Sequence, residues 1–222
     1  MREINQPQVN KNHYSFENYS SERRFISYYH QVNNVMKFVE NNHASNILIA
    51  GKGDGIVQRI LETYSNLFKL NLSVKTFDIA EDLDPDILGD LIELRNYVRE
   101  QYDVILCCQT LEHVMLDEAF QILEQMRFTS RFVIISVPYK AFTIRGCLKV
   151  PFIDEFEFLI KIPLWKNKKG MVDSRHYWEI GYSISKRKFK KEIRKIGYGI
   201  ISDYVIKKDG FKQFFVLESG NQ

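Results

Sequence analysis

Short apolar runs alternate with longer amphipathic segments after residue 45, and this alternation predicts βα units around a mainly parallel sheet. Four apolar runs have the length of buried strands, at residues 46–50, 73–79, 102–108 and 131–137. Between them, helical spacing is expected at 54–69 and 117–127, and a less regular acidic segment covers 80–94. Pro138 lacks a backbone donor and should end the fourth strand. The pattern favours a single α/β domain with appendages.

The two flanks of this pattern add further elements. Before residue 45, seven apolar residues recur at near-helical spacing and predict an N-terminal helix that packs on the domain: Phe25, Tyr28, Tyr29, Val32, Val35, Met36 and Val39. Residues 183–198 read as a helix closed near Gly197. The apolar runs 200–206 and 212–219 then flank Lys208-Asp209-Gly210, whose Asp-Gly pair is a turn signal, so we predict an antiparallel hairpin.

Residues 139–180 interrupt this order. The segment is aromatic and basic and contains two prolines, so it resembles neither a regular helix nor a strand. Long irregular excursions in compact domains are usually functional lids or disordered loops, and the aromatic content argues against disorder. We predict a lid insertion here, in a domain of residues 45–222 that follows an N-terminal helical segment of residues 1–44.

Composition narrows the classes of protein. The 222 residues are 45% hydrophobic and 27% charged, which is ordinary for a globular protein, and the net charge of +3 does not by itself indicate a nucleic-acid partner. Three cysteines, two of them adjacent, provide neither a disulfide framework nor paired zinc-ligand spacing, so we expect no metal. The first residues are polar, and no apolar run approaches the roughly 18–20 residues of a membrane span. We expect a cytoplasmic protein.

Three glycines follow the first predicted strand at alternate positions: Gly51, Gly53 and Gly55. Glycine lets a ligand approach the backbone closely, and a following helix offers unpaired N–H groups. A dinucleotide-binding GxGxxG turn would need glycine where Ile56 stands, so the turn alone indicates either a nucleotide-like ligand or a tight βα connection. Asp78, at the end of the next strand, could bind both hydroxyls of a ribose or cap a helix. Together they favour a nucleoside-containing cofactor.

Four segments carry a resemblance to a known family. The stretches NILIAGKGDG, VKTFDIAEDLDPDILGDL, YDVILCCQTLEHV and FVIISVP follow one another like the motifs of class I S-adenosylmethionine-dependent methyltransferases. Together with DSRHYWEIG they resemble a bacterial and archaeal branch of that family, over roughly residues 15–218. The resemblance implies a Rossmann-like, doubly wound, mainly parallel sheet with a C-terminal antiparallel hairpin. The implied activity is methyl transfer from S-adenosylmethionine, and the N-terminal segment would cover the active site.

The resemblance also implies roles for single residues. The three glycines would pass under the methionine and ribose of the cofactor, and Asp78, with Ile79 beside it, would bind the ribose hydroxyls. Asp90 matches the position near the adenine amino group, with Leu91 beside the ring, and Gln109 falls at the methionine end. All these segments would end on the ligand-binding edge of the sheet.

One position departs from the family pattern. Ile49 stands two residues before the first glycine, where the family usually places a carboxylate that orders the methionine moiety. Two interpretations follow. Either the remaining contacts still bind the cofactor, which is the reading we favour, or the chain is a weakened, methyltransferase-like binding or scaffold protein.

Two histidines are candidates for a general base, because imidazole titrates near neutral pH. His113 follows the strand at 102–108 and would lie beside the methyl group, although it could simply pack or cap a helix there. His176 lies in the stretch that returns to the active site in the family, although the His-Tyr-Trp cluster could simply anchor the lid. Glu112 is read as a first-turn carboxylate favoured by the helix dipole.

The acceptor is expected to be a small molecule, a glycan or a lipid-linked intermediate. By the resemblance, Tyr19 and Arg24 would cover the cofactor or acceptor, and Tyr177 and Trp178 would contact the acceptor. Seven cations in residues 186–195 suggest RNA or an anionic membrane surface as alternative partners. Phe189, Ile193 and Ile196 recur there at helical spacing, however, so we interpret these charges as the solvated face of an amphipathic helix. An RNA methyltransferase is therefore the less favoured alternative.

Overall fold

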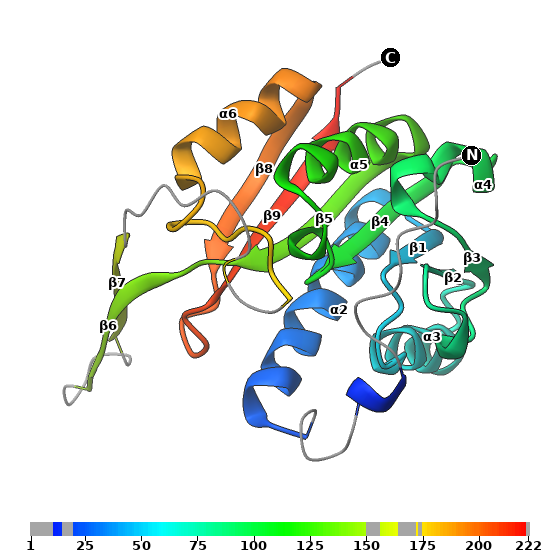
Figure 1. The fold of residues 1–222 in the computed structure, drawn as a ribbon. Coiled ribbons are helices and arrows are strands. Elements are labelled where there is room, and N and C mark those ends of the chain that lie inside the picture. The colour runs from blue at the N-terminus through cyan, green and yellow to red at the C-terminus, as the bar shows by residue number, and fades with distance from the viewer. Residues whose placement is uncertain (1–10, 15–19, 150–155, 164–171, 173–174, 221–222) are drawn as a thin grey trace.

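A seven-stranded sheet forms the centre of the protein (Figure 1). The computed structural model describes residues 11–14, 20–149, 156–163, 172 and 175–220. The strand order is β3-β2-β1-β4-β5-β9-β8. The strands are β1 (Asn46–Ala50), β2 (Ser73–Asp78), β3 (Ile87–Leu88), β4 (Tyr102–Cys108), β5 (Ser130–Pro138), β8 (Tyr198–Val205) and β9 (Lys212–Ser219). The first five pair in parallel, and β9 is antiparallel to both β5 and β8. The prediction of a doubly wound, mainly parallel sheet with a C-terminal antiparallel hairpin is confirmed.

Helices cover both faces of the sheet (Figure 1). On one face α2 (Glu22–Asn42) and α3 (Ile56–Phe68) pack on alternate strand residues such as Ile47 and Ile49. On the other face α5 (Leu116–Thr129) and α6 (Lys186–Ile196) pack on residues such as Leu48 and Ala50. Because strand side chains alternate between faces, each short apolar run supplies two separate hydrophobic cores. The predicted N-terminal helix is confirmed as α2.

The remaining elements are short. The acidic segment forms two 3-10 turns (Glu81–Leu83 and Leu91–Glu93), strand β3 and the single turn of α4 (Leu94–Tyr97). Further 3-10 turns occur at Lys11–His13 and Leu111–His113. In α6, Phe189 and Ile193 are fully buried and five cations are exposed, so the predicted solvated face is confirmed for Arg187, Lys188, Lys191, Arg194 and Lys195. Lys186 and Lys190 are instead half-buried and pair with Asp203. Within the described residues, every helix is too short or too polar to cross a lipid bilayer.

The prediction that residues 139–180 are irregular was wrong for residues 141–148 and 156–163. Strands β6 (Ala141–Leu148) and β7 (Phe156–Pro163) pair as an antiparallel hairpin that extends away from the main sheet (Figure 1). Pro163 does not interrupt β7, because it is the last residue of that strand, and Pro151 lies outside the described residues. Apolar side chains alternate along both strands and share one face, which leaves six of them exposed: Phe142, Ile144, Leu148, Phe158, Ile160 and Ile162.

Candidate functional site

A cavity of about 700 Å³ opens at the C-terminal ends of β1, β2 and β4. Its volume lies in the range of about 300–1,000 Å³ that small-molecule sites occupy. The wall contains eleven of the residues predicted for the site: Arg24, Gly51, Gly53, Asp78, Ile79, Asp90, Leu91, Gln109, His113, His176 and Tyr177. Parallel strands end together at one edge of a sheet, so segments distant in the sequence meet here.

The glycine turn is fixed by Asp78. Its Oδ2 accepts the backbone N–H of Lys52 at 2.8 Å and its Oδ1 accepts that of Ala80 at 3.0 Å, which leaves one lone pair on each oxygen for a ligand. Gly51 has a φ of +89°, and a Cβ on it would lie 2.3 Å from Oγ1 of Thr110. A side chain is therefore excluded at Gly51 by both backbone conformation and space.

Two acidic caps shape the ends of this wall. Asp54 accepts the N–H of Ile56 at 3.1 Å at the start of α3 and also accepts the hydroxyl of Tyr28, which ties α2 to the glycine turn. At the far end, Oδ1 of Asp90 accepts the N–H of Ile92 at 3.0 Å and so places Leu91 against the cavity. Such side-chain caps satisfy the N–H groups that a helical turn leaves unpaired.

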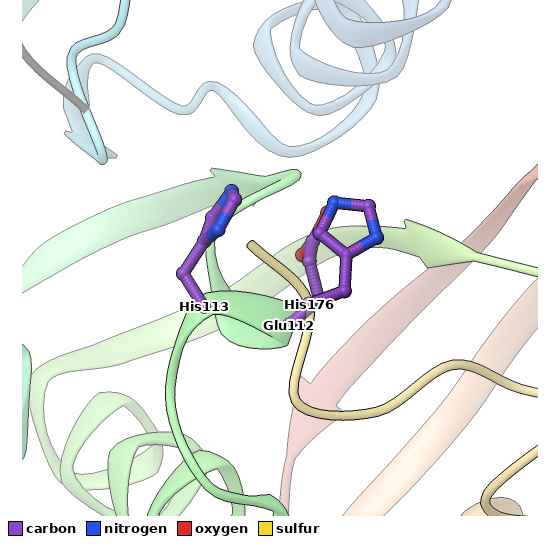
Figure 2. Close-up of side chains that lie close together, drawn as sticks. All are labelled: Glu112, His113 and His176. Atoms are coloured by element: carbon purple, nitrogen blue, oxygen red, sulfur yellow. The ribbon is translucent and has the colours of Figure 1, made fainter. Parts of the chain in front are cut away.

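Three hydrogen bonds join the turn after β4 to the loop at residues 175–178. Nδ1–H of His113 donates to the carbonyl oxygen of Arg175 at 2.9 Å, the N–H of Tyr177 donates to that of Glu112 at 2.9 Å, and Nε1–H of Trp178 donates to that of Leu111 at 3.1 Å. The two segments lie more than sixty residues apart in the chain. This pairing carries His176 to the cavity beside Glu112 and His113 (Figure 2).

Comparison with solved structures identifies proteins that have a similar architecture. With a magnesium protoporphyrin IX methyltransferase from Synechocystis PCC 6803 bound to SAH, the TM-score is 0.57 at 13% identity, covering 97% of this chain and 90% of that one. With the glycopeptide N-methyltransferase MtfA in complex with S-adenosylmethionine, the TM-score is 0.52 at 8% sequence identity. The match covers 85% of this chain and 93% of that one. With an O-methyltransferase family protein from Burkholderia thailandensis, the TM-score is 0.53 at 11% sequence identity. The match covers 94% of this chain and 64% of that one.

The chain has the class I methyltransferase fold. This confirms the fold that the resemblance implied. Neither a protein-family model nor a curated protein matches the sequence. At identities this low the likeness concerns the fold, so the chemistry must be argued from the residues of this chain.

Within this methyltransferase fold, two predicted site residues lie away from the cavity wall. Gly55 is buried, with a φ of +73°, and precedes the first residue of α3, so it shapes the turn without lining the cavity. Trp178 is 1% exposed and stacks near Phe189 in the core, so its ring is not available to an acceptor. The prediction that Trp178 contacts the acceptor is corrected to a structural role. Tyr19 lies outside the described residues.

Ile49 occupies the wall where the family keeps a carboxylate. Its side chain is 5% exposed and belongs to the apolar cluster that also contains Tyr28 and Val57. Gln109, on the facing strand end, has a φ of +56°, and its Nε2 lies 3.4 Å from Oγ of Ser136. The end of the cavity where the resemblance would place methionine is therefore lined by an isoleucine and an amide, without a carboxylate at position 49.

Sequence reasoning missed Glu112. The sequence indicates only a first-turn carboxylate favoured by the helix dipole, but the side chain is fully buried, and burial raises its pKa to about 7. Neither carboxylate oxygen has a hydrogen-bond partner among the described residues. The loop at 175–178 covers the turn that contains Glu112. The local sequence TLEHV cannot indicate this burial, because the covering residues lie more than sixty positions away.

The N-terminal residues His13 and Tyr14 also line the cavity, and the sequence had not singled them out. Burial, followed by the nearby Arg175 guanidinium, holds the pKa of His13 below its usual value. Nη1 of Arg175 lies 3.1 Å from Nε2 of His13, so the loop at 175–178 also contacts the N-terminal cover. The cavity is thus bordered by the sheet edge, by α2 and by this loop.

Proposed function

We propose that this chain is an S-adenosylmethionine-dependent methyltransferase. The observation that carries the proposal is Asp78 at the end of β2, facing the cavity and bonded to a glycine turn that a side chain on Gly51 would obstruct. A carboxylate at this place suits the two hydroxyls of a ribose, and open α/β sheets bind nucleosides at this edge. The fold and its cofactor-bound structural neighbours support the same assignment.

The other residues of the wall then divide by position. Asp90 and Leu91 would contact the adenine, Ile79 would lie beside the ribose, and Gly53 and Gln109 would border the ribose and methionine. Methyl transfer is an in-line displacement at the methyl carbon, so its main requirement is an acceptor atom held on axis at roughly 3–3.5 Å. A cavity enclosed by α2 and the loop at 175–178 supplies such positioning.

The acceptor in this proposal is a small molecule, a glycan or a lipid-linked compound. Arg24 on α2 and Tyr177 on the loop line the part of the wall that the cofactor residues do not occupy, and Tyr19 remains a predicted contact. His113 and His176 lie at the same end, where an imidazole could take a proton from the acceptor. A porphyrin and a glycopeptide are acted on by the structural neighbours, which illustrates how widely acceptors vary on this fold.

Calorimetry with S-adenosylmethionine and S-adenosylhomocysteine tests the proposal. We expect micromolar binding of both by the wild-type chain and at least tenfold weaker binding by Asp78→Asn. Asp84→Asn is the matched control, because Asp84 also follows β2 in the chain, is exposed and is absent from the cavity wall. Thermal melting of each variant separates lost affinity from lost folding. No binding by the wild-type chain at millimolar ligand would remove the enzyme hypothesis.

A binding or scaffold protein is the second candidate, and Ile49 is the observation that favours it. An apolar side chain there removes a contact to the charged end of methionine. The two candidates differ in turnover. If the chain binds the cofactor yet transfers no labelled methyl group to any component of cell extracts, the scaffold reading is supported. Identification of a labelled product would support the enzyme and would name its acceptor.

A further inference from the structure

Glu112, His113 and His176 bring three ligand-forming groups together at the cavity (Figure 2). One ligand atom from each residue lies within 4.8 Å of those of the other two. Glu112 and His113 are adjacent in the 3-10 turn after β4, whereas His176 comes from the loop that crosses it. In Figure 2 the two imidazoles lie opposite one another in an edge arrangement, with the Glu112 side chain behind His176.

The Glu112 carboxyl group is the first sign of a ligand. It is fully buried, and neither oxygen has a hydrogen-bond partner within the described part of the chain. Nearly all buried polar side chains in native proteins are hydrogen-bonded, because burying one without a partner is costly in apolar surroundings. A group at the cavity wall that binds Glu112 would remove that cost.

The imidazole orientations are the second, independent sign. His113 donates Nδ1–H to the Arg175 carbonyl, and Nδ1–H of His176 donates to Oε1 of Glu179 at 2.9 Å. Glu179 is itself 6% exposed. In its neutral form each ring therefore carries its proton on Nδ1 and its lone pair on Nε2. Metal-ligating histidines are almost always oriented in this manner, by a carbonyl or a carboxylate on the other ring nitrogen.

We propose that Glu112, His113 and His176 bind a divalent transition-metal ion. Two imidazoles and one carboxylate suit ions such as Mn²⁺, Co²⁺ or Zn²⁺, whereas Mg²⁺ and Ca²⁺ favour sites made of oxygen. With bonds of about 2.1 Å, two ligands of one ion lie at most about 4.2 Å apart, so the 4.8 Å limit requires side-chain movements of less than about an ångström. Three protein ligands leave further positions open toward the cavity.

An ion at this site would narrow the chemical class of methyl acceptor, and this step rests on the proposed methyltransferase function. An acceptor hydroxyl bound at an open position would lose its proton to water more readily, because the ion stabilises the alkoxide. That oxygen would then bond to the methyl carbon while the carbon–sulfur bond breaks and its electron pair stays on sulfur. The imidazoles would act as ligands in place of general bases, and oxygen acceptors would be favoured over nitrogen or carbon.

Metal titration of the whole chain tests the site directly. After treatment with a chelator, wild-type protein should bind one Co²⁺ per chain and show the visible absorption of a nitrogen- and oxygen-coordinated ion. We expect Glu112→Gln, His113→Ala and His176→Ala each to weaken Co²⁺ binding at least tenfold. His43→Asn is the matched control, because His43 is exposed, ends α2 in a left-handed conformation that asparagine tolerates, and lies outside the cavity wall.

A second readout uses the wild-type protein alone. Pulsed electron paramagnetic resonance of bound Mn²⁺ should show coupling to two imidazole nitrogens, and this result does not depend on a variant that folds. Binding weaker than millimolar, or Mn²⁺ without nitrogen coupling, would overturn the proposal. Calorimetry with S-adenosylmethionine on the same samples separates the two hypotheses, since cofactor binding without metal binding refutes only the metal site, and the reverse refutes only the methyltransferase.

Discussion

The backbone N–H of Tyr177 donates to the carbonyl oxygen of Glu112 at 2.9 Å, and this bond joins the two motifs of the site. His176 precedes Tyr177 and His113 follows Glu112, so this bond, together with those to the Arg175 and Leu111 carbonyls, holds the two imidazoles near one another. Their ring centroids lie 5.3 Å apart. The arrangement of groups at this end of the cavity therefore depends on contacts between the turn at residues 111–113 and the loop at 175–178, which is much later in the sequence.

Trp178 should contribute to stability rather than to acceptor binding. Its indole N–H satisfies the Leu111 carbonyl, and the ring is buried against Phe189. We expect Trp178→Phe to lower the free energy of unfolding by about 1–3 kcal/mol, because a buried carbonyl loses its donor. Urea unfolding measures the change, and Tyr29→Phe, at an exposed position, should alter it by less than about 0.5 kcal/mol. A Trp178→Phe variant as stable as wild type would contradict the assigned role.

Gly51→Ala should damage the cofactor site. The substituted Cβ would lie 2.3 Å from Oγ1 of Thr110 at a φ of +89°, so the turn must shift. We expect the free energy of unfolding to fall by about 1–3 kcal/mol and S-adenosylmethionine affinity to fall at least tenfold. Gly199→Ala is the control, because its new Cβ would meet no atom closer than 3.7 Å. Equal affinities for Gly51→Ala and wild type would show that the turn does not contact the cofactor.

Asp203 should make part of the stability depend on pH. Burial acts to raise its pKa, but ion pairs with Lys186 and Lys190 outweigh burial and hold the pKa below its usual value. A depressed folded-state pKa stabilises the protein above the unfolded-state pKa, and this stabilisation is lost as the pH falls through the folded-state pKa. We expect Asp203→Asn to be less stable than wild type by about 1 kcal/mol at pH 7, a difference that vanishes in acid.

Urea unfolding at several pH values checks this expectation. Glu218→Gln provides a comparison, because the pair of Glu218 with Arg131 is 3.7 Å long and largely exposed, so its loss should cost only a few tenths of a kcal/mol. A gap between Asp203→Asn and wild type that stays constant into strong acid would mean that the ion pairs are not its source.

Ile49→Glu should not restore the family pattern. Ile49 is 5% exposed within an apolar cluster, so a carboxylate there would be buried among apolar side chains or would displace Tyr28 and Val57. We expect a loss of about 2 kcal/mol or more in the free energy of unfolding and no gain in S-adenosylmethionine affinity. Ile49→Val, at a cost of about 0.5–1.5 kcal/mol, is the steric control. Tighter cofactor binding by Ile49→Glu would show that the missing carboxylate limits affinity.

Much of the sheet could be predicted because its signals are local. The apolar runs at β1, β2, β4 and β5 are short and bounded, and Asp-Gly marks the turn between β8 and β9. The cavity wall could also be predicted in part, since Asp78 and Gln109 simply follow the ends of parallel strands. Predicting that these two residues line the site requires only the knowledge that the strands are parallel.

The features that were not predicted depend on contacts between segments distant in the sequence, which no local pattern can indicate. Burial of Glu112 results from the loop at 175–178, and Trp178 enters the core because its indole finds the Leu111 carbonyl. The hairpin of β6 and β7 had a readable period of two along Phe142 to Leu148, but its aromatic and basic composition obscured that alternation. Each of these wrong predictions concerns a residue buried by a distant segment or a strand that pairs outside the main sheet.

The position of β9 has a consequence for how the protein folds. β9 lies between β5 and β8, although it follows both in the chain. During synthesis β8 therefore has no place in the main sheet until β9 has been made, and the long edge of β5 remains open until then. An unpaired strand edge is a template for association with other chains. Molecules whose synthesis stops within the β8–β9 turn should consequently be the most aggregation-prone products of this gene.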